Sequence, residues 1–247
     1  MSGHSKWSTI KRKKGATDAK RGVIFTRLSK DITLAARESG GDIELNPGLR
    51  LAVKKAKSSN MPAANIERAI KKGTGDLPGV VFDEFTYEGY GPGGVAIMLN
   101  VLTDNKNRTY PEIKHIMTKN NGNLGELGCV NWMFEKKGTI TILQAGIEED
   151  ELLELSLELG ADDFNSADDV FEITTTPDAF GDVSTGLEAA GHIVEGEVGL
   201  TPINTVKVTG GDISQLLKLL ELLEEHEDVQ KVYSNFDIDE ADLKDLD

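Results

Sequence analysis

The spacing of apolar residues changes near residue 80, and this change limits the folds open to the chain more than any other feature. Between residues 18 and 73, apolar side chains such as Phe25, Leu28 and Ile32 recur every three or four positions. That period predicts helices with one buried face. Glycines that end helices, and Asn or Pro residues that begin them, divide the region into helices over 18–40, 47–57 and 62–73.

After residue 80, short β-rich segments alternate with helical ones. A capping box, Thr109 to Glu112, is expected to begin the first helix of this region. The strands expected are Phe82–Tyr87, Val95–Leu102, Cys129–Phe134, Ile140–Leu143, Asp163–Asn165, Val170–Thr175, Ile193–Val198, Val206–Val208 and Val229–Ser234. The helices expected are 109–120, 148–159, 177–190 and 213–225.

This order predicts an α+β multidomain protein with three domains. Residues 1–78 read as a basic N-terminal arm and a three-helix domain. Residues 138–204 follow the order β-α-β-β-α-β, which is ferredoxin-like, and form an acidic inserted domain. The flanking segments 79–137 and 205–247 make a second, discontinuous ferredoxin-like α/β domain. We therefore expect the strand Val206–Val208 to pair in the sheet that contains Val95–Leu102.

Charge is segregated along the chain. Residues 1–72 hold 17 Lys and Arg against 6 Asp and Glu, a net charge of +11, whereas residues 73–247 have a net charge of −26. Between Lys137 and Lys207 there are 16 acidic residues and no Lys or Arg. This asymmetry favours a basic element that binds a polyanion and an acidic body available to protein partners. The alternative is solvated surface throughout.

The basic residues concentrate at the N-terminus, where they can neutralise phosphates without selecting a sequence. Trp7 can stack on a base or pack against the helices. A solubilising tail or a membrane-surface patch are alternatives, although the segment lacks the apolar face of an interfacial helix. The nucleic-acid-binding candidates are Lys6, Trp7, Lys11, Arg12, Lys13, Lys14, Lys20, Arg21 and Arg27, and secondary candidates are Arg68, Lys71, Lys72, Lys106 and Arg108.

No group of residues in the sequence indicates catalysis or a cofactor. The string Gly89-x-Gly91-x-x-Gly94 contains a proline and precedes a strand, so we interpret it as a turn between strands instead of a dinucleotide site. His4, His115, His192 and His226 lack metal-ligand spacing. The acids near 235–246 lack the glycine and the final glutamate of a calcium loop.

The single cysteine, Cys129, excludes an intramolecular disulfide, and a buried structural role is favoured over a nucleophilic one. No apolar run approaches the ~18 residues that a membrane span requires. We therefore expect a non-enzymatic protein of a reducing, aqueous compartment, with no cofactor, no metal ion, no small-molecule substrate and no membrane.

Several longer motifs identify a resemblance to the YebC/PmpR family that covers essentially the whole chain. They are Gly3–Trp7, Asp18–Gly22, Asn46-Pro47, Asn60–Pro62 with Ile66–Ile70, Tyr87–Gly94, Leu102–Asn105 with Asn107–Thr109, Gly122–Gly125 and Asp228–Tyr233. The resemblance implies three domains, the third inserted in the second. It also implies a cytoplasmic, non-enzymatic regulator of gene expression.

Members of that family are described as DNA-binding transcriptional regulators. Mitochondrial relatives are translational activators, and bacterial members have been tied to the ribosome. Two hypotheses therefore follow from the resemblance: a transcriptional regulator that binds DNA, and a translation factor that binds ribosomal RNA through the same basic segment. Only the basic N-terminal motif and the loop from Asp104 to Thr109 are carried over as site residues.

Overall fold

The computed structural model describes residues 18–79, 81–167, 169–239 and 242. They form two compact units, each discontinuous in sequence. One unit comprises the described residues up to 129 together with 210–232, and the other comprises 130–209 together with those after 232. The division into three domains, with boundaries at 78, 137 and 204, stays a prediction.

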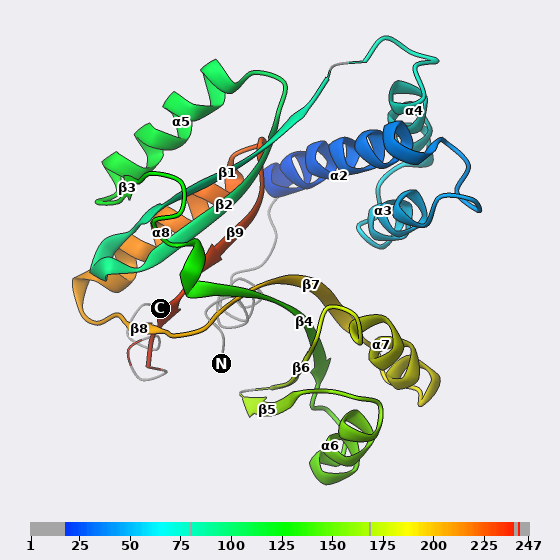
Figure 1. The fold of residues 1–247 in the computed structure, drawn as a ribbon, viewed down its shortest axis with the longest axis vertical. Helices are drawn as coiled ribbons and strands as arrows, with labels where there is room; N and C mark the ends of the chain where they lie inside the picture. The colour runs from blue at the N-terminus through cyan, green and yellow to red at the C-terminus, as the bar shows by residue number, and fades with distance from the viewer. Residues whose placement is uncertain (1–17, 80, 168, 240–241, 243–247) are drawn as a thin grey trace. The chain divides into compact units, whose positions relative to one another are not determined.

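The first unit begins with the three helices that the apolar spacing predicts, and this prediction is confirmed. They are α2 (Asp18–Ser39), α3 (Pro47–Ser58) and α4 (Ala63–Gly73). Figure 1 shows α2 alongside α3 and α4. Their apolar faces meet in one core that includes Ile32 and Leu49, both fully buried. A Cβ at Gly73 would lie 2.5 Å from the carbonyl oxygen of Thr33, so α4 crosses α2 where only glycine fits.

Asn46 joins the start of α3 to the end of α2. Its side-chain oxygen accepts a hydrogen bond from the Leu49 amide at 3.0 Å, which caps the helix. Its side-chain amide donates to the carbonyls of Ala35 and Gly40, both at 2.8 Å. The predicted cap at Asn46-Pro47 is therefore confirmed, and the same side chain also satisfies carbonyls at the end of α2.

A four-stranded sheet of order β3-β1-β2-β9 completes the first unit. β1 (Asp83–Tyr90) pairs antiparallel along its whole length with β2 (Ala96–Thr103). β3 (Asn123–Leu124) pairs only with the last two residues of β1. β9 (Val229–Ser234) lies on the other side of β2. β2 is buried along nearly all of its length, as its apolar run predicts.

The turn between β1 and β2 holds the glycine-rich string. Gly93 and Gly94 adopt φ of 71° and 76°, a region that glycine enters without strain. The Gly91 amide donates to the Val95 carbonyl at 2.8 Å, which closes the turn. The predicted turn between strands is confirmed, because β2 follows directly where a dinucleotide site would need a helix.

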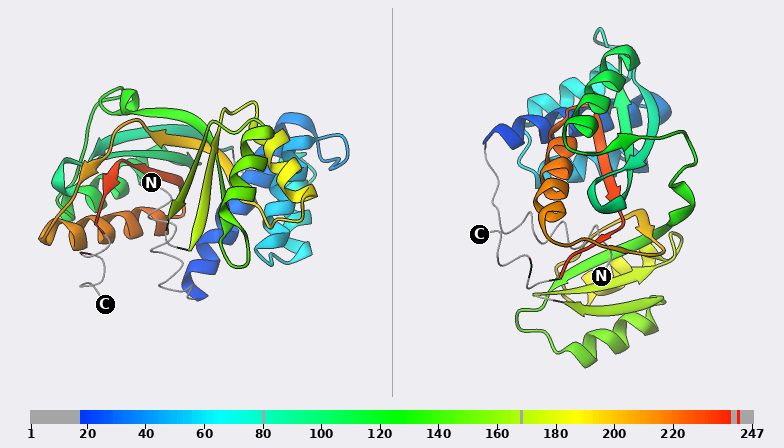
Figure 2. Two further views of the ribbon diagram at one scale, coloured as in Figure 1. Left: turned by 90° about the horizontal axis from the view of Figure 1, so that it is seen from below. Right: turned by 90° about the vertical axis from the view of Figure 1, so that its left-hand side faces the viewer.

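Two helices, α5 (Lys106–Lys119) and α8 (Gly211–Glu225), pack on each other and on this sheet. Both views of Figure 2 show α8 beside the strands. The buried residues of α5 are Thr109, Ile113 and Met117, and α8 buries leucines on most of its turns. These apolar faces position the loop before α5 and the turn after α8 at the same end of the unit.

Three predictions about local structure are wrong. Val206–Val208 does not join the sheet of β2, because the amides of Val206 and Val208 donate to the carbonyls of Asn235 and Asp237, which lie beyond the end of β9. Instead β8 (Val206–Lys207) pairs in parallel with β10 (Phe236–Asp237) as a two-stranded sheet. Cys129–Phe134 is not a strand, since the Met133 amide turns back to the Val130 carbonyl and β4 begins only at Phe134.

The third error concerns the predicted capping box. α5 begins at Lys106, and its cap is Asn105, whose side-chain oxygen accepts from the Arg108 amide at 3.2 Å. Thr109 lies inside the helix and is fully buried. Its hydroxyl is drawn into a polar network around Asp228 instead of capping the helix.

The second unit contains a sheet of order β5-β6-β4-β7 in which all neighbours are antiparallel. Ile140 and Ile173 from the sheet pack against Leu152, Val183 and Leu187 from the helices in one core. The strands are β4 (Phe134–Leu143), β5 (Asp163–Ala167), β6 (Val170–Thr175) and β7 (Glu195–Pro202), and the helices are α6 (Glu149–Glu158) and α7 (Phe180–Ala189). A helical region and two four-stranded sheets therefore bear out the α+β prediction. Among the described residues, no helix is both long and apolar enough to cross a membrane.

Replacing Asn46 by alanine should lower the free energy of unfolding by about 2 kcal/mol. The variant loses the cap of α3 and leaves the Ala35 and Gly40 carbonyls without their donor. Urea unfolding followed by far-UV circular dichroism measures the change. The matched control is Asn107→Ala on the exposed side of α5, which should change stability by less than about 0.5 kcal/mol.

Candidate nucleic-acid interface

Most of the predicted primary contacts lie outside the described residues. This holds for Lys6, Trp7 and the basic run of Lys11, Arg12, Lys13 and Lys14. Lys20 lies in α2, and its side chain is outside the description. Arg21 is exposed in the first turns of α2. A role for the arm in binding phosphates therefore stays a prediction.

Arg27 does not face outward as the phosphate-binding prediction requires. Its guanidinium donates to the Glu224 carbonyl and, at 3.2 Å, to the His226 carbonyl. These carbonyls lie at the end of α8, where the helix dipole attracts a cation. Burial lowers the pKa of Arg27, although Glu224 and Asp31 oppose this effect. Arg27 therefore joins α2 to α8, and a role for it in binding phosphates stays a prediction.

A polar groove of about 310 Å³ lies between α2 and α4. Its lining contains basic side chains and no acidic one: Thr26, Ser29, Lys30, Thr33, Asn65, Arg68, Ala69, Lys72 and Phe82. The hydroxyls of Thr26, Ser29 and Thr33 follow one face of α2, since they are three and four residues apart. Asn65, Arg68 and Lys72 repeat the same spacing on α4.

The groove offers what a phosphodiester backbone requires. Lys30 lines it but directs its ammonium elsewhere, so Arg68 and Lys72 supply the positive charge. Both are exposed, and Asn65 lies on the same face of α4. The hydroxyls of α2 line the other side of the groove, where those of Thr26 and Thr33 donate to backbone carbonyls. Arginine, lysine and short hydroxyl side chains make most phosphate contacts in protein complexes with nucleic acids. The structure thus brings together Arg68 and Lys72 of the secondary candidates, and Lys71 is exposed beside them.

The basic surface of α3 was missed as a candidate. Arg50, Lys54, Lys55 and Lys57 are all exposed, and the helix contains no acidic residue. Their helical spacing without intervening acids was the available signal. Arg50 also donates to the Ile43 carbonyl at 3.2 Å, which ties the helix to the preceding loop.

The two secondary candidates at the start of α5 do not form one site with the groove. The Lys106 ammonium lies over the Phe85 ring, 4.5 Å from its centre. Arg108 donates to Asp228 at 2.7 Å and to Asp104 at 3.2 Å. The Arg108 side chain is 39% exposed, so part of its guanidinium faces solvent, while the buried Asp228 carboxylate balances its charge.

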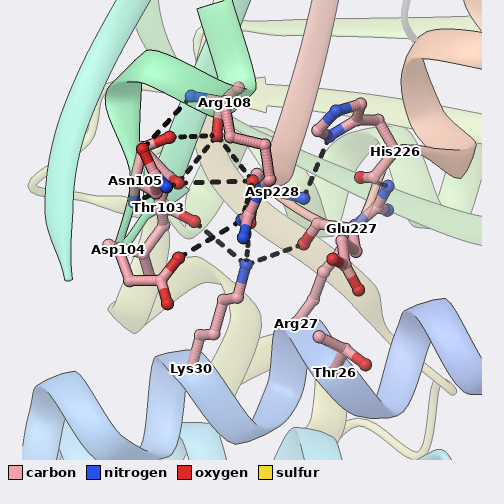
Figure 3. Close-up of polar contacts among 12 residues, drawn as sticks. Thr26, Arg27, Lys30, Thr103, Asp104, Asn105, Arg108, His226, Glu227 and Asp228 are labelled. Atoms are coloured by element: carbon pink, nitrogen blue, oxygen red, sulfur yellow. Dashed lines mark hydrogen bonds and ion pairs between the residues drawn. The ribbon is translucent and has the colours of Figure 1, made fainter. Parts of the chain in front are cut away.

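Asp228 is the centre of a buried polar network (Figure 3). One carboxylate oxygen accepts from the Lys30 ammonium at 2.5 Å. The other accepts from Arg108 and from the Thr109 hydroxyl, each at 2.7 Å. Lys30 donates its remaining protons to the carbonyls of Leu102 and Glu227, at 3.1 and 3.0 Å. The network thereby joins α2, the end of β2, the start of α5 and the turn after α8.

The charge state of Asp228 follows from these contacts. Burial by itself would raise its pKa, but hydrogen bonds from Lys30, Thr109 and Arg108 and the charge of Lys30 outweigh burial. The pKa of Asp228 therefore lies well below its ordinary value, and the carboxylate is ionised at neutral pH. The sequence offered no local signal for this role, because the partners of Asp228 lie more than a hundred positions away.

Glu112, His226 and Asp228 bring ligand atoms within 4.8 Å of one another, as a metal site would. Hydrogen bonds already occupy these atoms. The Asp228 amide donates to His226 Nδ1 at 3.1 Å, so in the neutral ring Nε2 carries the proton. That nitrogen lies 3.2 Å from the Glu112 carboxylate, which accepts from it. The three residues therefore act as a hydrogen-bonded support for the network.

The variant Asp228→Asn should lower the free energy of unfolding by about 3–5 kcal/mol, because it leaves the buried Lys30 ammonium without its counter-charge. Urea unfolding at neutral pH measures the loss. Asp104→Asn is the matched control, since Asp104 also pairs with Arg108 but is 31% exposed. It should change stability by less than about 1 kcal/mol. Equal losses in the two variants would show that the network is not centred on Asp228.

The depressed pKa of Asp228 predicts that its contribution to the free energy of unfolding depends on pH. Because the pKa of Asp228 is depressed in the folded state, its stabilising effect is complete above about pH 4, its unfolded pKa, and falls as the pH drops below that value. The difference in unfolding free energy between the wild type and Asp228→Asn should therefore narrow between about pH 5 and pH 2. A difference that stays constant over this range would contradict the assignment.

Comparisons with known proteins agree along the whole chain. A family model described as the TACO1/YebC protein N-terminal domain matches residues 5–76, and one described as the TACO1/YebC second and third domain matches residues 82–236. A probable transcriptional regulatory protein of Desulfotalea psychrophila is 58% identical over 100% of this chain and 99% of its own length. Another of Dictyoglomus turgidum is 53% identical over 100% of both chains. A crystal structure of a conserved hypothetical protein from Aquifex aeolicus, 45% identical, covers 90% of this chain and 93% of its own, with a TM-score of 0.81.

Proposed function

The chain belongs to the TACO1/YebC family, and from that premise we propose that it is a transcriptional regulatory protein that binds DNA and has no enzymatic activity of its own. The observation that carries the proposal is identity above 50%, over essentially the full length, with proteins named probable transcriptional regulatory proteins. In the proposed mechanism the protein acts in the cytoplasm and needs no cofactor. Its basic N-terminal region binds the phosphate backbone of the DNA.

The arrangement of charge in the described residues supports this mechanism. Arg68 and Lys72 face a groove without acids, and α3 carries four exposed cations. In this proposal the N-terminal arm adds the residues from Lys6 to Lys20 to the same contact. The acidic second unit, which repels phosphate, limits the contact to one region of the chain.

A ribosome-associated translation factor is the second candidate function. The specific observation in its favour is that the cations of α3 and α4 suit phosphates, while these helices present few side chains arranged to read base edges. A protein that binds through charge alone gains selectivity from a uniquely shaped RNA surface more readily than from a promoter sequence. The same residues would contact ribosomal RNA in that case.

We also propose that residues 138–204 are a ferredoxin-like domain inserted in the second domain. The element order β4-α6-β5-β6-α7-β7 and the pairing of β4 between β6 and β7 support this proposal. The inserted domain holds 16 acidic residues and no Lys or Arg, so we assign protein contacts to it instead of nucleic-acid contacts.

Reversing Lys11, Arg12, Lys13 and Lys14 to glutamate should abolish binding to duplex DNA at physiological salt. If about six phosphates are neutralised in the wild type, the logarithm of the binding constant should fall with the logarithm of salt at a slope of roughly −5. The double variant Arg68→Glu/Lys72→Glu should reduce the steepness of that slope by about 2. Fluorescence anisotropy of a labelled duplex at several salt concentrations measures both changes.

The control for these variants is Lys136→Glu/Lys218→Glu, which changes the net charge equally at two exposed positions outside the basic region. It should leave affinity and slope close to the wild type. If it weakens binding as much as Arg68→Glu/Lys72→Glu, then net charge and not the groove determines binding.

Competition separates the two candidate functions. The purified protein is titrated at physiological salt against a candidate promoter, a scrambled duplex and intact ribosomes. Promoter affinity more than about a thousandfold above that for the scrambled duplex indicates a specific DNA reader. Duplex affinities within about tenfold of each other, together with tight ribosome binding, would favour the translation factor.

A further inference from the structure

One long edge of β1 is unpaired in the described part of the chain. β2 pairs with β1 from Asp83 to Tyr90, but on the opposite side β3 pairs only with Gly89 and Tyr90. The chain then leaves the sheet after Gly125, whose amide donates to the Glu88 carbonyl at 2.8 Å. No other described strand lies on that side of β1.

The hydrogen bond from the Gly125 amide to the Glu88 carbonyl shows which way the unpaired backbone groups of β1 point. Along a strand, successive residues direct their N–H and C=O groups to alternate edges. Since Glu88 directs its carbonyl toward β3, Thr86 and Glu84 direct theirs to the same side. Both residues are exposed. Exposed backbone groups in a row are a template for another strand.

A hollow of about 440 Å³ runs along this edge. Its lining includes every residue from Glu84 to Glu88, together with Lys106 and Tyr110 of α5 and with Leu124, Gly125 and Leu127. Tyr110 meets the Tyr87 ring edge-on at 5.5 Å between centres, so α5 forms the apolar wall. Leu127, 80% exposed, projects at the end of the hollow.

Two features give this hollow unsatisfied binding capacity. The Tyr87 hydroxyl is buried and has no hydrogen-bond partner among the described residues. Apolar surface at Leu127 and Tyr110 remains in contact with water. The Glu88 carboxylate accepts from the Gly128 amide at 2.8 Å, which holds the loop that carries Leu127 in place. The hollow is thus already formed before anything binds.

Charge limits what can occupy the edge. Asp83 and Glu84 lie at the open end of β1, whereas Lys106, the cation that lines the hollow, lies over the ring of Phe85, which faces the other side of the strand from Glu84. A phosphate backbone along the Glu84 side would therefore meet like charge. A second copy of the chain pairing through the same edge would also bring carboxylates together. A strand with a basic side chain next to Glu84 would instead be attracted.

We propose that the open edge of β1 binds an extended peptide segment of another protein as an additional strand, antiparallel to β1 and in line with β3. The segment alternates large apolar residues, which contact Tyr110 and Leu127, with basic residues, which face Glu84. Main-chain hydrogen bonds to Thr86 and Glu84 provide the register, and the alternate side chains provide selectivity. This site is separate from the groove between α2 and α4, since none of the groove residues takes part, although Lys106, a secondary nucleic-acid candidate, lines the hollow.

The test uses the full-length protein and a labelled short peptide in which lysine alternates with valine and phenylalanine. We expect saturable binding by fluorescence anisotropy, and at least tenfold weaker binding of a peptide with the same residues arranged in blocks. Leu127→Ser should weaken binding of the alternating peptide at least tenfold. Leu51→Ser, which alters a leucine of similar exposure on α3, should leave it unchanged.

A series of N-methylated peptides tests the strand geometry without altering the protein. Two peptides are compared, one methylated at its odd-numbered amides and one at its even-numbered amides. Only alternate amides face β1, so one of these peptides should lose binding and the other should bind almost as before. Equal effects in the two methylated peptides, no binding to the alternating peptide, or equal loss in Leu51→Ser and Leu127→Ser would each overturn the proposal.

Discussion

The ion pair between Lys30 and Asp228 determines how the first unit is held together. Removing an ammonium and a carboxylate from water is costly unless each is fully hydrogen-bonded, and here both are. The contacts of the pair come from β2, α5 and the turn after α8, so the helical region, the sheet and its covering helices share one polar centre. Arg27 adds a second connection from α2 to the end of α8.

The same contacts change the meaning of the charge distribution. The first 72 residues have a strong positive balance, but Lys30 and Arg27 direct their charges inward, to groups of the fold. Arg108, in the loop that the family resemblance indicated, is likewise balanced by Asp228. The surface available to a polyanion is therefore smaller and more localised than composition suggests, and it is concentrated on α3, on α4 and, by prediction, in the N-terminal arm.

Elements that depend on local periodicity were predictable from the sequence. The helices from Asp18 to Gly73 and the buried strand β2 follow from apolar spacing and from capping residues such as Asn46. Apart from the local turn at Val130–Met133, the errors occurred where a distant partner decides the structure. Thr109 reads locally as a helix cap, yet Asp228 holds its hydroxyl inside the unit. Val206 fits a strand, but only the tertiary arrangement shows that Phe236 is its partner. Asp228 carried no local signal, since its contacts are distant in sequence.

Because the chain is synthesised from its N-terminus, Lys30 is made well before its partner Asp228. The two residues are 198 positions apart, and the whole of the second unit's sheet lies between them. At a synthesis rate of about 5–20 residues per second, Lys30 leaves the peptidyl transferase some 10–40 seconds before its carboxylate does. During that interval the three helices can pack, but the first unit lacks β9 and a counter-charge for Lys30. Nascent chains therefore carry the N-terminal helices for that interval without the turn after α8 that supplies Asp228.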